Sequence, residues 1–275
     1  MAYTRSKKNK KKQEKKRKLI IIFSILLFLI CVGFVFLMRT EHIQISTVEI
    51  TGNGFVQEVS LRNVVEKNLY GDSLLFIPKT NILFLQNNRI ENEILEGFME
   101  VEDVSVNRSG LKSIEVLVTE RLDEYVLCQE GSCFSFDESS FIFMESVRSI
   151  EEIPYYFSST KTYSIGDNFL NAGTILEISI LIDSLEKKGL DIVEVHEYTD
   201  FTYVLKTKKG TKILVPAQDA YDDIYSILVK LFNTEDFLLD KDAEDFRKDF
   251  AYINVQFGKK IFSCLVGEEC EINYQ

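Results

Sequence analysis

The sequence predicts an α+β protein that is held in a membrane by a single N-terminal helix, and three observations support this fold class. Twenty consecutive residues near the N-terminus carry no charge. Several later segments alternate apolar and polar residues, as half-buried strands do. Between them, other segments repeat apolar residues at helical spacing. The chain has 275 residues, 45% of them apolar and 27% charged, which leaves room for about two folded domains.

The uncharged stretch, residues 19–38, is long enough to cross the hydrocarbon core of a bilayer as a helix. A cleaved secretory signal is the alternative, but its apolar region would be shorter and would end in small residues, whereas this one ends in Phe36-Leu37-Met38. Basic residues gather before the helix and only Arg39 directly follows it. The positive-inside rule therefore predicts a cytoplasmic N-terminus, with residues 39–275 outside the cytoplasm.

Charge is distributed unevenly along the chain. The formal net charge is −11, yet residues 1–18 carry ten basic side chains against the single acid Glu14. Such a tail also fits a nuclear-localisation or nucleic-acid patch. Next to a membrane helix we interpret it as a topology determinant that contacts anionic lipid. The rest of the chain carries −20, which argues against nucleic acid as a partner of the folded part.

Residues 45–121 predict a small domain with the order strand, helix, helix, strand, strand. In chain order we expect a strand at 48–51, broken by Gly52-Asn53-Gly54; a helix at 56–69 with Val59, Val64, Val65 and Leu69 near helical spacing; a helix through Ile90, Ile94 and Leu95, capped by Asn87 or Asn88 and ending at Gly97; and strands at 101–107 and 114–119, joined by a hairpin loop.

Residues 122–265 predict a second, β-rich domain with two amphipathic helices, and residues 266–275 are expected to form a tail. The expected strands are 125–127, 134–136, 141–143, 201–206, 211–215, 251–257 and 261–265. The first helix is expected to begin at a capping box, Thr174 with Glu177, and to end at Gly189, with Ile178, Leu181, Ile182 and Leu185 on one stripe. The second is expected at 220–232, with Ile224, Ile227, Leu228 and Leu231 facing inward.

The order of the first domain, directly after a single membrane helix, resembles the POTRA domain of the FtsQ/DivIB bacterial cell-division proteins. The matching segments are 48–53, 81–85, 101–106 and 116–121, and the Val-Thr-Glu-Arg ending of the last is the most specific. Phe98-Met99 and Ser109-Gly110 stand where family members usually carry prolines. The order of helix, hairpin, helix and terminal hairpin in residues 122–265 also resembles the β domain of this family.

The resemblance implies a non-enzymatic scaffold of the divisome at the septum, with partners of the FtsB/DivIC and FtsL type and other division components. A free sheet edge offers backbone groups to a partner strand, and two proteins tethered in one bilayer meet at raised effective concentration. We therefore predict strand addition at residues 252–262. The expected contact residues are Tyr252, Val255, Phe257, Ile261 and Phe262. For Tyr252 and Val255, packing in the core is the alternative.

A second docking surface is predicted on the POTRA segment at Ile114, Val116, Val118 and Arg121. Arg121 could instead pair with Glu120 or Glu124. The expected occupants of this second surface are upstream division proteins.

Catalytic motifs are missing from the sequence. The two histidines, His42 beside the membrane and His196 in an expected strand, lack the context of a triad, and no H-E-x-x-H, G-x-S-x-G or P-loop spacing occurs. The acids Asp222, Asp223 and those within 235–249 do not follow a Ca²⁺-loop pattern. We expect no cofactor and no metal. A membrane-anchored extracytoplasmic cell-wall enzyme using carboxylates is the alternative function, and a role in export or surface assembly is a third.

Four of the five cysteines lie outside the membrane helix, which contains Cys31. They are Cys128, Cys133, Cys264 and Cys270. A hairpin loop could bring the Cβ atoms of Cys128 and Cys133 within disulfide distance, and an extracytoplasmic location permits the bond. Three pairings remain possible. Free thiols are one alternative, and a four-cysteine zinc site is a weaker one because no C-x₂-C spacing appears.

Overall fold

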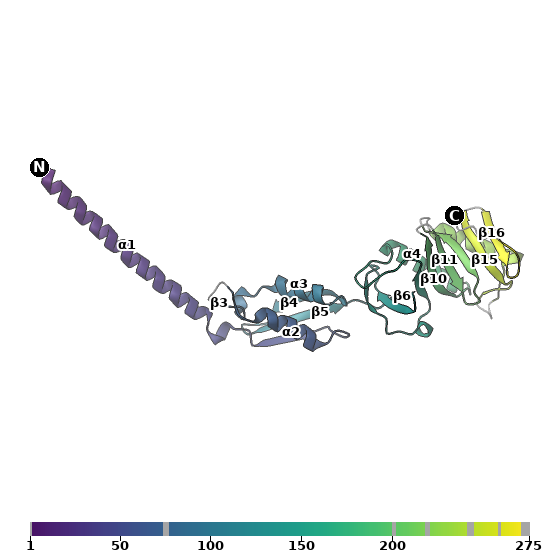
Figure 1. Ribbon diagram of the computed structural model, residues 1–275, viewed down its shortest axis with the longest axis horizontal. Coiled ribbons are helices and arrows are strands. Elements are labelled where there is room, and N and C mark those ends of the chain that lie inside the picture. Colours follow the sequence, from purple (N-terminus) through teal and green to yellow (C-terminus); the bar gives the residue numbers. More distant parts are fainter. Residues whose placement is uncertain are drawn as a thin grey trace. The chain divides into compact units, whose positions relative to one another are not determined.

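The computed structural model describes residues 2–73, 77–199, 202–217, 221–240, 245–257 and 260–270. The chain divides into two compact units, Met1–Glu120 and Arg121–Gln275. Helices and sheets occur in both folded parts, so the predicted α+β class is confirmed (Figure 1).

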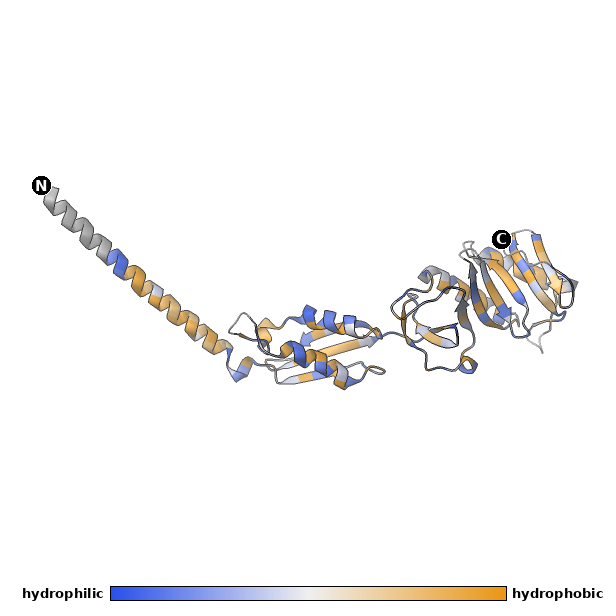
Figure 2. Cartoon of the chain, viewed as in Figure 1, coloured by the Kyte–Doolittle hydropathy of each residue, from blue (hydrophilic) through white to orange (hydrophobic). Residues whose placement is uncertain are grey.

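The N-terminal helix α1 (Ala2–Met38) contains the apolar segment. Its part Lys15–Met38 is long and apolar enough to cross a membrane, and none of it is buried inside the protein. Figure 2 shows this part of the helix coloured mostly as hydrophobic. One such helix, near the N-terminus, suggests single-pass membrane anchoring. The helix begins well before the apolar segment, so the basic tail continues the same helix.

The rest of the first unit is a three-stranded sheet in the order β1-β5-β4 with two helices. The outer strand β1 runs parallel to β5, whereas β4 runs antiparallel to it. The elements are η1 (Glu41–Ile43), β1 (Thr47–Thr51), α2 (Glu58–Leu69), β2 (Asp72–Ser73), β3 (Ile77–Pro78), η2 (Ile82–Phe84), α3 (Asn87–Gly97), β4 (Val101–Arg108) and β5 (Ser113–Glu120). The predicted order of strand, helix, helix, strand, strand is present.

Two local predictions in this unit are wrong. Val59 is exposed, and Leu61 takes the buried position on α2 with Val65. Asn87 is the first residue of α3 and not its cap, because its side chain donates instead to the carbonyl of Val106. The pattern of apolar residues therefore located each helix, while its buried face and its cap depended on tertiary contacts.

The turn after β1 requires glycine. Gly52 has φ +88°, and a Cβ atom added there would lie 2.0 Å from the carbonyl oxygen of Val118. The following loop is held by Glu120, whose carboxylate accepts hydrogen bonds from the backbone N–H groups of residues 54, 55 and 56 at 2.8 to 2.9 Å. The glutamate of the Val-Thr-Glu-Arg segment thus fastens the first loop of the domain to its last strand.

The second unit is built on a nine-stranded sheet in the order β16-β15-β12-β11-β10-β9-β6-β7-β8. A separate two-stranded pair is formed by β13 and β14. The strands are β6 (Tyr125–Gln129), β7 (Ser132–Phe136), β8 (Ile142–Glu145), β9 (Tyr156–Ser159), β10 (Ile192–Thr199), β11 (Thr202–Thr207), β12 (Lys212–Pro216), β13 (Leu239–Asp240), β14 (Asp245–Phe246), β15 (Phe250–Phe257) and β16 (Lys260–Leu265). The helices are η3 (Ile150–Glu152), α4 (Ala172–Glu186), α5 (Tyr221–Phe232) and η4 (Glu235–Phe237).

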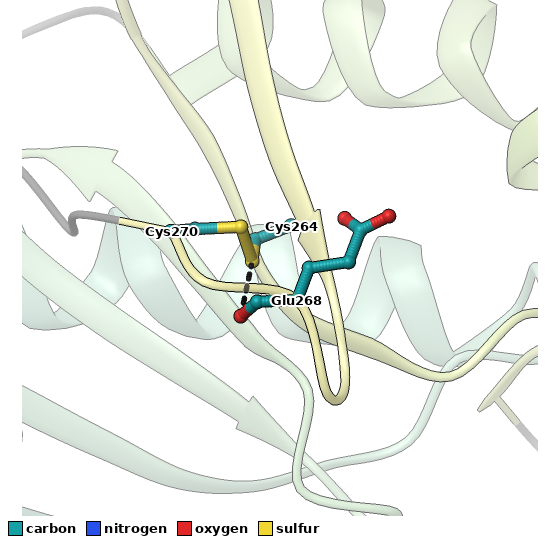
Figure 3. A group of neighbouring side chains, drawn as sticks. All are labelled: Cys264, Glu268 and Cys270. Carbon is teal, nitrogen blue, oxygen red and sulfur yellow. Dashed lines mark hydrogen bonds between the residues drawn. A yellow bond between two sulfur atoms is a disulfide. The ribbon is translucent and has the colours of Figure 1, made fainter.

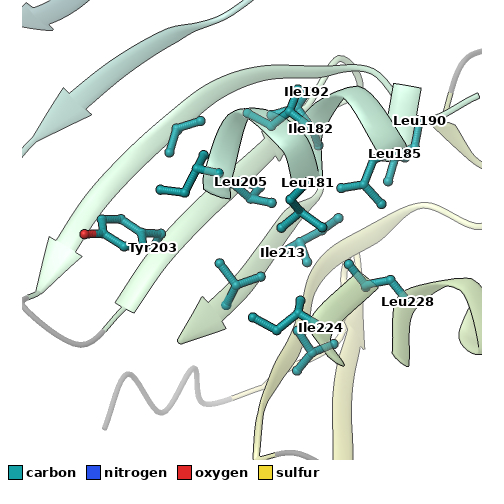
Figure 4. Packing of buried hydrophobic residues seen from close by; sticks show 14 of the residues in the cluster. Leu181, Ile182, Leu185, Leu190, Ile192, Tyr203, Leu205, Ile213, Ile224 and Leu228 are labelled. Carbon is teal, nitrogen blue, oxygen red and sulfur yellow. The ribbon is translucent and has the colours of Figure 1, made fainter. Parts of the chain in front are cut away.

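The main core lies between one face of this sheet and helices α4 and α5 (Figure 4). The predicted stripe on α4, which includes Leu181 and Leu185, is buried there, together with Ile224 and Leu228 of α5. A smaller cluster of Val204, Leu214, Tyr252 and Cys264 lies elsewhere in the sheet. Because Val204 and Leu214 adjoin core residues along their strands, strand alternation places this cluster on the opposite face.

The sequence predictions for this unit need three corrections. Helix α4 begins at Ala172, and its cap is Asn171, whose side chain accepts the N–H of Gly173, so Thr174 and Glu177 are not its capping box. Strand β9 was not predicted, and β10 only through His196, although both lie in the middle of the sheet. Phe201 and Ala220, expected at the starts of a strand and a helix, lie outside the described residues.

Candidate partner-binding edge

The last strand of the sheet, and not the strand before it, forms the edge. β15 is paired on both sides, in parallel with β12 through residues 252–254 and antiparallel with β16. β16 pairs with β15 alone among the described strands. The predicted binding segment 252–262 therefore combines an interior strand with the first part of a free edge.

Two of the predicted contact residues are core residues. Val255 is buried in the main core, and Tyr252 is buried on the opposite face with Val204 and Leu214. Their side chains are covered by the protein itself. Packing in the core, the alternative for both, is what the structure shows.

The side chains of the other three residues differ in how far they are exposed. Phe257 and Phe262 are exposed by 46% and 49%. Their rings meet edge to face, with centroids 5.5 Å apart and planes at 85°. Ile261 is half-buried against the main core. An exposed aromatic pair beside a free edge is a suitable anchor for an added strand.

A disulfide closes the end of this edge. Cys264 of β16 is bonded to Cys270, and the chain between them turns back over the end of the strand (Figure 3). The backbone N–H of Leu265 donates to the carboxylate of Glu268 at 3.1 Å, and that of Val266 donates to the carbonyl of Asp249 at 2.9 Å. Cys264, Glu268 and Cys270 have ligand atoms within 4.8 Å of one another. Metal binding would need free thiolates, which the disulfide removes.

The second disulfide lies at the far side of the sheet. Cys128 and Cys133 face each other across the antiparallel pair β6 and β7, with a Cα–Cα distance of 4.1 Å. The turn between them is tighter than expected, because Gln129 already pairs with Ser132. Glu130 and Gly131 make the turn with φ of 50° and 87°.

The edges of the POTRA-like sheet are occupied by side chains. On β4, the N–H of Val106 donates to Oε1 of Glu91 at 2.8 Å, and its carbonyl accepts from Nδ2 of Asn87 at 2.6 Å. On β1, the carbonyl of Val48 accepts from Nη1 of Arg62 at 3.1 Å. Helices α3 and α2 thus use backbone groups that a partner strand would need.

The second edge of the nine-stranded sheet is also partly closed. At the start of β8, the N–H of Ile142 donates to the carbonyl of Asp167 at 2.9 Å, and the carbonyl of Ile142 accepts from the N–H of Gly166 at 2.8 Å. A chain segment of the protein therefore already pairs with this strand. Of the four outer strands in the two large sheets, β16 has the longest stretch, residues 260–264, without such a contact among the described residues.

The predicted POTRA docking residues do not form an exposed surface. Ile114, Val116 and Val118 are buried in the core of the first unit. Their neighbours Glu115, Leu117 and Thr119 are exposed on the other face of β5. The prediction placed the outward residues one position away from where strand alternation puts them.

Arg121, the fourth of these residues, makes a partly buried ion pair. Its Nη1 lies 2.6 Å from Oδ2 of Asp137, and its guanidinium lies 4.5 Å from the centroid of the Phe141 ring. Burial raises the pKa of Asp137, but hydrogen bonds from Ser139, Arg121 and the N–H of Phe141 outweigh it and hold the pKa below its ordinary value. Arg121 thereby fixes the start of the second unit.

The one histidine in the second unit does not form a triad. Ser158 Oγ lies 2.7 Å from both Nδ1 of His196 and Oε1 of Glu194. In a catalytic triad the imidazole stands between the hydroxyl and the carboxylate, whereas here the hydroxyl stands between the other two. Burial lowers the pKa of His196, although Glu194 and Glu197 raise it in part. Glu194 and His196 line an open cleft with Lys206 and Lys212.

The alternative function, a cell-wall enzyme, would use the carboxylates of Asp222 and Asp223 or of the acidic segment 235–249. Asp223 is exposed on α5, and the side chain of Asp222 lies outside the described residues, as do residues 241–244 of the acidic segment.

Comparison with known families identifies the first unit. Residues 43–121 match the family model described as POTRA domain, FtsQ-type. A search of the curated proteins gives no match. The chain thus contains an FtsQ-type POTRA domain at residues 43–121, preceded by an apolar N-terminal helix.

This combination fits the FtsQ/DivIB cell-division proteins, and the resemblance of the first domain to their POTRA domain is confirmed. Domains of this type support a scaffold role in the divisome, and their family is generally non-enzymatic. The FtsQ-type domain also implies interactions with division proteins in general, and the apolar helix suggests single-pass membrane anchoring.

Proposed function

We propose that this protein is a non-enzymatic, single-pass scaffold that binds FtsB/DivIC- and FtsL-like proteins by adding a partner strand to β16 during septum formation. The observation that supports this proposal is the free outer side of β16, which no other described strand occupies. The basic N-terminus lies in the cytoplasm, where it contacts anionic lipid, and both folded units lie outside.

Strand addition at β16 needs backbone pairing and a side-chain anchor. The strand runs from Lys260 to Leu265, long enough for a short partner strand. Phe262 is exposed on this strand, and Phe257 is exposed at the end of the neighbouring β15. A partner tethered in the same membrane does not need a large interface, since tethering raises its effective concentration.

The first experiment substitutes the exposed aromatic residue of β16. In co-purification of the full chain with its FtsB/DivIC-like partner, we expect Phe262→Lys to weaken binding about tenfold or more, because an anchor is replaced by a charge. Val266→Lys is the matched control, since Val266 is exposed and apolar but follows the strand. Equal binding by both variants would contradict the assignment of the edge.

The second experiment distinguishes strand addition from side-chain docking. Backbone pairing protects amide hydrogens from exchange, so the partner should slow exchange in residues 260–264 of the full chain. Residues 103–107 of β4, where side chains occupy the edge, should show no change. Protection at β4 without protection at β16 would move the binding site to the first unit.

The cellular role has its own test. Depletion of the protein should give filamentous or chained cells, because septation loses its scaffold. Normal septation under depletion would remove the division role, whatever the binding experiments show.

A further inference from the structure

One end of the POTRA domain is fastened to the end of the membrane helix. Asn81 is buried, and its side chain accepts the N–H of Leu83 at 2.9 Å while donating to the carbonyl of Met38 at 2.8 Å. Arg39 pairs with Asp72 at 2.9 Å. In Figure 1, β3 lies beside the end of α1. These contacts place residues 72–73 and 77–83 beside the end of α1, where the helix leaves the bilayer.

The start of β5 lies at this same end. The N–H of Ile45 donates to the carbonyl of Thr80 at 2.7 Å, and the N–H of Ser46 donates to the carbonyl of Lys112 at 2.8 Å. The chain from Met38 to Ser46 therefore connects the membrane helix to the β4–β5 hairpin. The opposite end of β5, at Glu120, is about 25 Å away at the usual rise of a strand.

Exposed apolar side chains gather at the end that adjoins α1. We call them, with the basic residues beside them, the basal surface. It consists of Tyr70, Lys79, Leu83, Phe84, Arg108, Leu111 and Lys112. Tyr70 is 84% exposed, although it follows directly after α2, and its neighbour Gly71 accepts the N–H of Lys79. Leu83, Phe84 and Leu111 are also exposed.

Charge differs between the two ends of the domain. The basal surface carries Lys79, Arg108 and Lys112, and Lys79 shares a small hollow with Phe84 and Arg89. Glu41, Glu66 and Asp72 are acids near this surface, and Asp72 is paired with Arg39. The opposite end is acidic, with Glu58, Glu96, Glu100, Glu102 and Glu120 at the ends of the helices and strands that meet there.

We propose that the basal surface lies on the leaflet from which α1 emerges, with Tyr70, Leu83, Phe84 and Leu111 at the boundary of headgroups and acyl chains. Aromatic and apolar side chains favour that boundary, and basic side chains beside them contact lipid phosphates. The occupant is the bilayer itself, because α1 holds this surface beside it permanently. The proposal rests on membrane anchoring and is independent of strand addition at β16.

The absence of tryptophan from the chain makes a direct test possible. Tyr70→Trp and Phe84→Trp each introduce a sole tryptophan at the basal surface. Phe55→Trp is the matched control, because Phe55 is 59% exposed and its N–H is bonded to Glu120 at the opposite end of the domain. The full chain is reconstituted in vesicles of phosphatidylcholine with phosphatidylglycerol, with and without brominated phosphatidylcholine, which quenches tryptophan by contact.

We expect brominated lipid to remove about half of the emission of Tyr70→Trp and Phe84→Trp, because side chains at the headgroup boundary contact the upper acyl chains. Phe55→Trp should keep its emission. No quenching at either basal position would overturn the proposal, and equal quenching at Phe55 would show collapse of the whole domain onto the lipid instead.

A charge variant separates lipid contact from mere proximity. Replacing Lys79, Arg108 and Lys112 by glutamate in the Tyr70→Trp chain should reduce quenching in vesicles that contain phosphatidylglycerol, because the headgroup contacts become repulsive. Circular dichroism of the variant checks that the domain stays folded. Unchanged quenching would show that apolar contact holds the surface on the lipid without the basic residues. It would overturn the proposed contact of these residues with lipid phosphates. Partner binding at β16 should be unaffected in every variant.

Discussion

The two larger sheets of this protein differ in which groups occupy the backbone N–H and carbonyl groups at their edges. In the POTRA domain, side chains of Asn87 and Glu91 occupy both backbone groups of Val106 on β4, and Arg62 occupies the carbonyl of Val48 on β1. In the second unit, residues 166–168 pair with the start of β8, while β16 pairs with β15 alone among the described strands. Both sheets are open, so the ability to accept a strand depends on a few side-chain and backbone contacts at each edge and not on the fold class.

The largest expected effect comes from opening the β4 edge. Asn87→Ala with Glu91→Ala leaves the N–H and carbonyl of Val106 without partners, and Val106 is only 1% exposed. We expect a loss of about 3 kcal/mol in the free energy of unfolding of the POTRA domain, since each buried orphan group costs about 1–3 kcal/mol. Urea unfolding of the full chain in detergent, followed by hydrogen exchange within residues 101–108, measures it. A stable variant with slow exchange would show that these side chains do not close the edge.

Removing the disulfide at the end of β16 should have the next largest effect. For a loop this short, Cys264→Ser with Cys270→Ser should cost about 2 kcal/mol in the free energy of unfolding of the second unit. Cys128→Ser with Cys133→Ser is the control, because that pair closes a loop of similar length away from the β16 edge. Both variants should lose stability, but only the first should weaken partner binding. Equal binding losses would show that the edge does not depend on the closing loop.

A smaller effect should appear as a pH dependence of the second unit. Burial holds the pKa of His196 below 6.5, so as pH falls through 6.5 the unfolded chain takes up a proton that the folded chain does not. Stability present above pH 6.5 should therefore decline as pH falls toward the folded pKa. Urea midpoints at pH 7.5 and 5.5 measure the decline, and His196→Gln should flatten it. Glu194 and Asp137 titrate at lower pH, because burial raises the pKa of each carboxyl but hydrogen bonds outweigh it and hold the pKa below its ordinary value.

The smallest effect concerns the β1 edge. Arg62→Ala removes the contact with the carbonyl of Val48 and the exposed pair with Glu58, so we expect a loss below about 1 kcal/mol in the free energy of unfolding. Arg89→Ala is the matched control, because Arg89 also forms an exposed pair four residues along its helix, with Glu93. If Arg89→Ala lost more free energy of unfolding than Arg62→Ala, the contact of Arg62 with Val48 would add nothing to the effect of the surface ion pair.

Sequence patterns predicted the fold well where one face of an element is buried. The apolar stripe of α4 and the alternation of β5 each follow from a single periodicity. Strand β9 was missed because it is short and carries its polar residues, such as Ser158, toward contacts with Glu194 and His196 that no local pattern reveals. The capping box at Thr174 failed because Asn171, three residues earlier, already caps the helix.

The candidate site was harder to predict than the fold. The aromatic residues of the last two strands were found by sequence, but which of them are covered depends on β12 pairing beside β15, a contact between segments about forty residues apart. The closing of the other edges was not predictable at all. It depends on single side chains such as Glu91, whose pairing with Val106 requires the packing of α3 on β4.

The backbone pairing of Ile142 with residues 166 and 167 bears on how many partner strands the nine-stranded sheet can bind. A sheet with two free edges could accept a strand at each edge, and repeated addition could build fibres. Here one margin is short and already engaged at its first residue by the chain's own Gly166 and Asp167. If the partner adds its strand at β16 as proposed, growth is restricted to a single direction, and we expect each copy to bind one partner strand in a one-to-one complex.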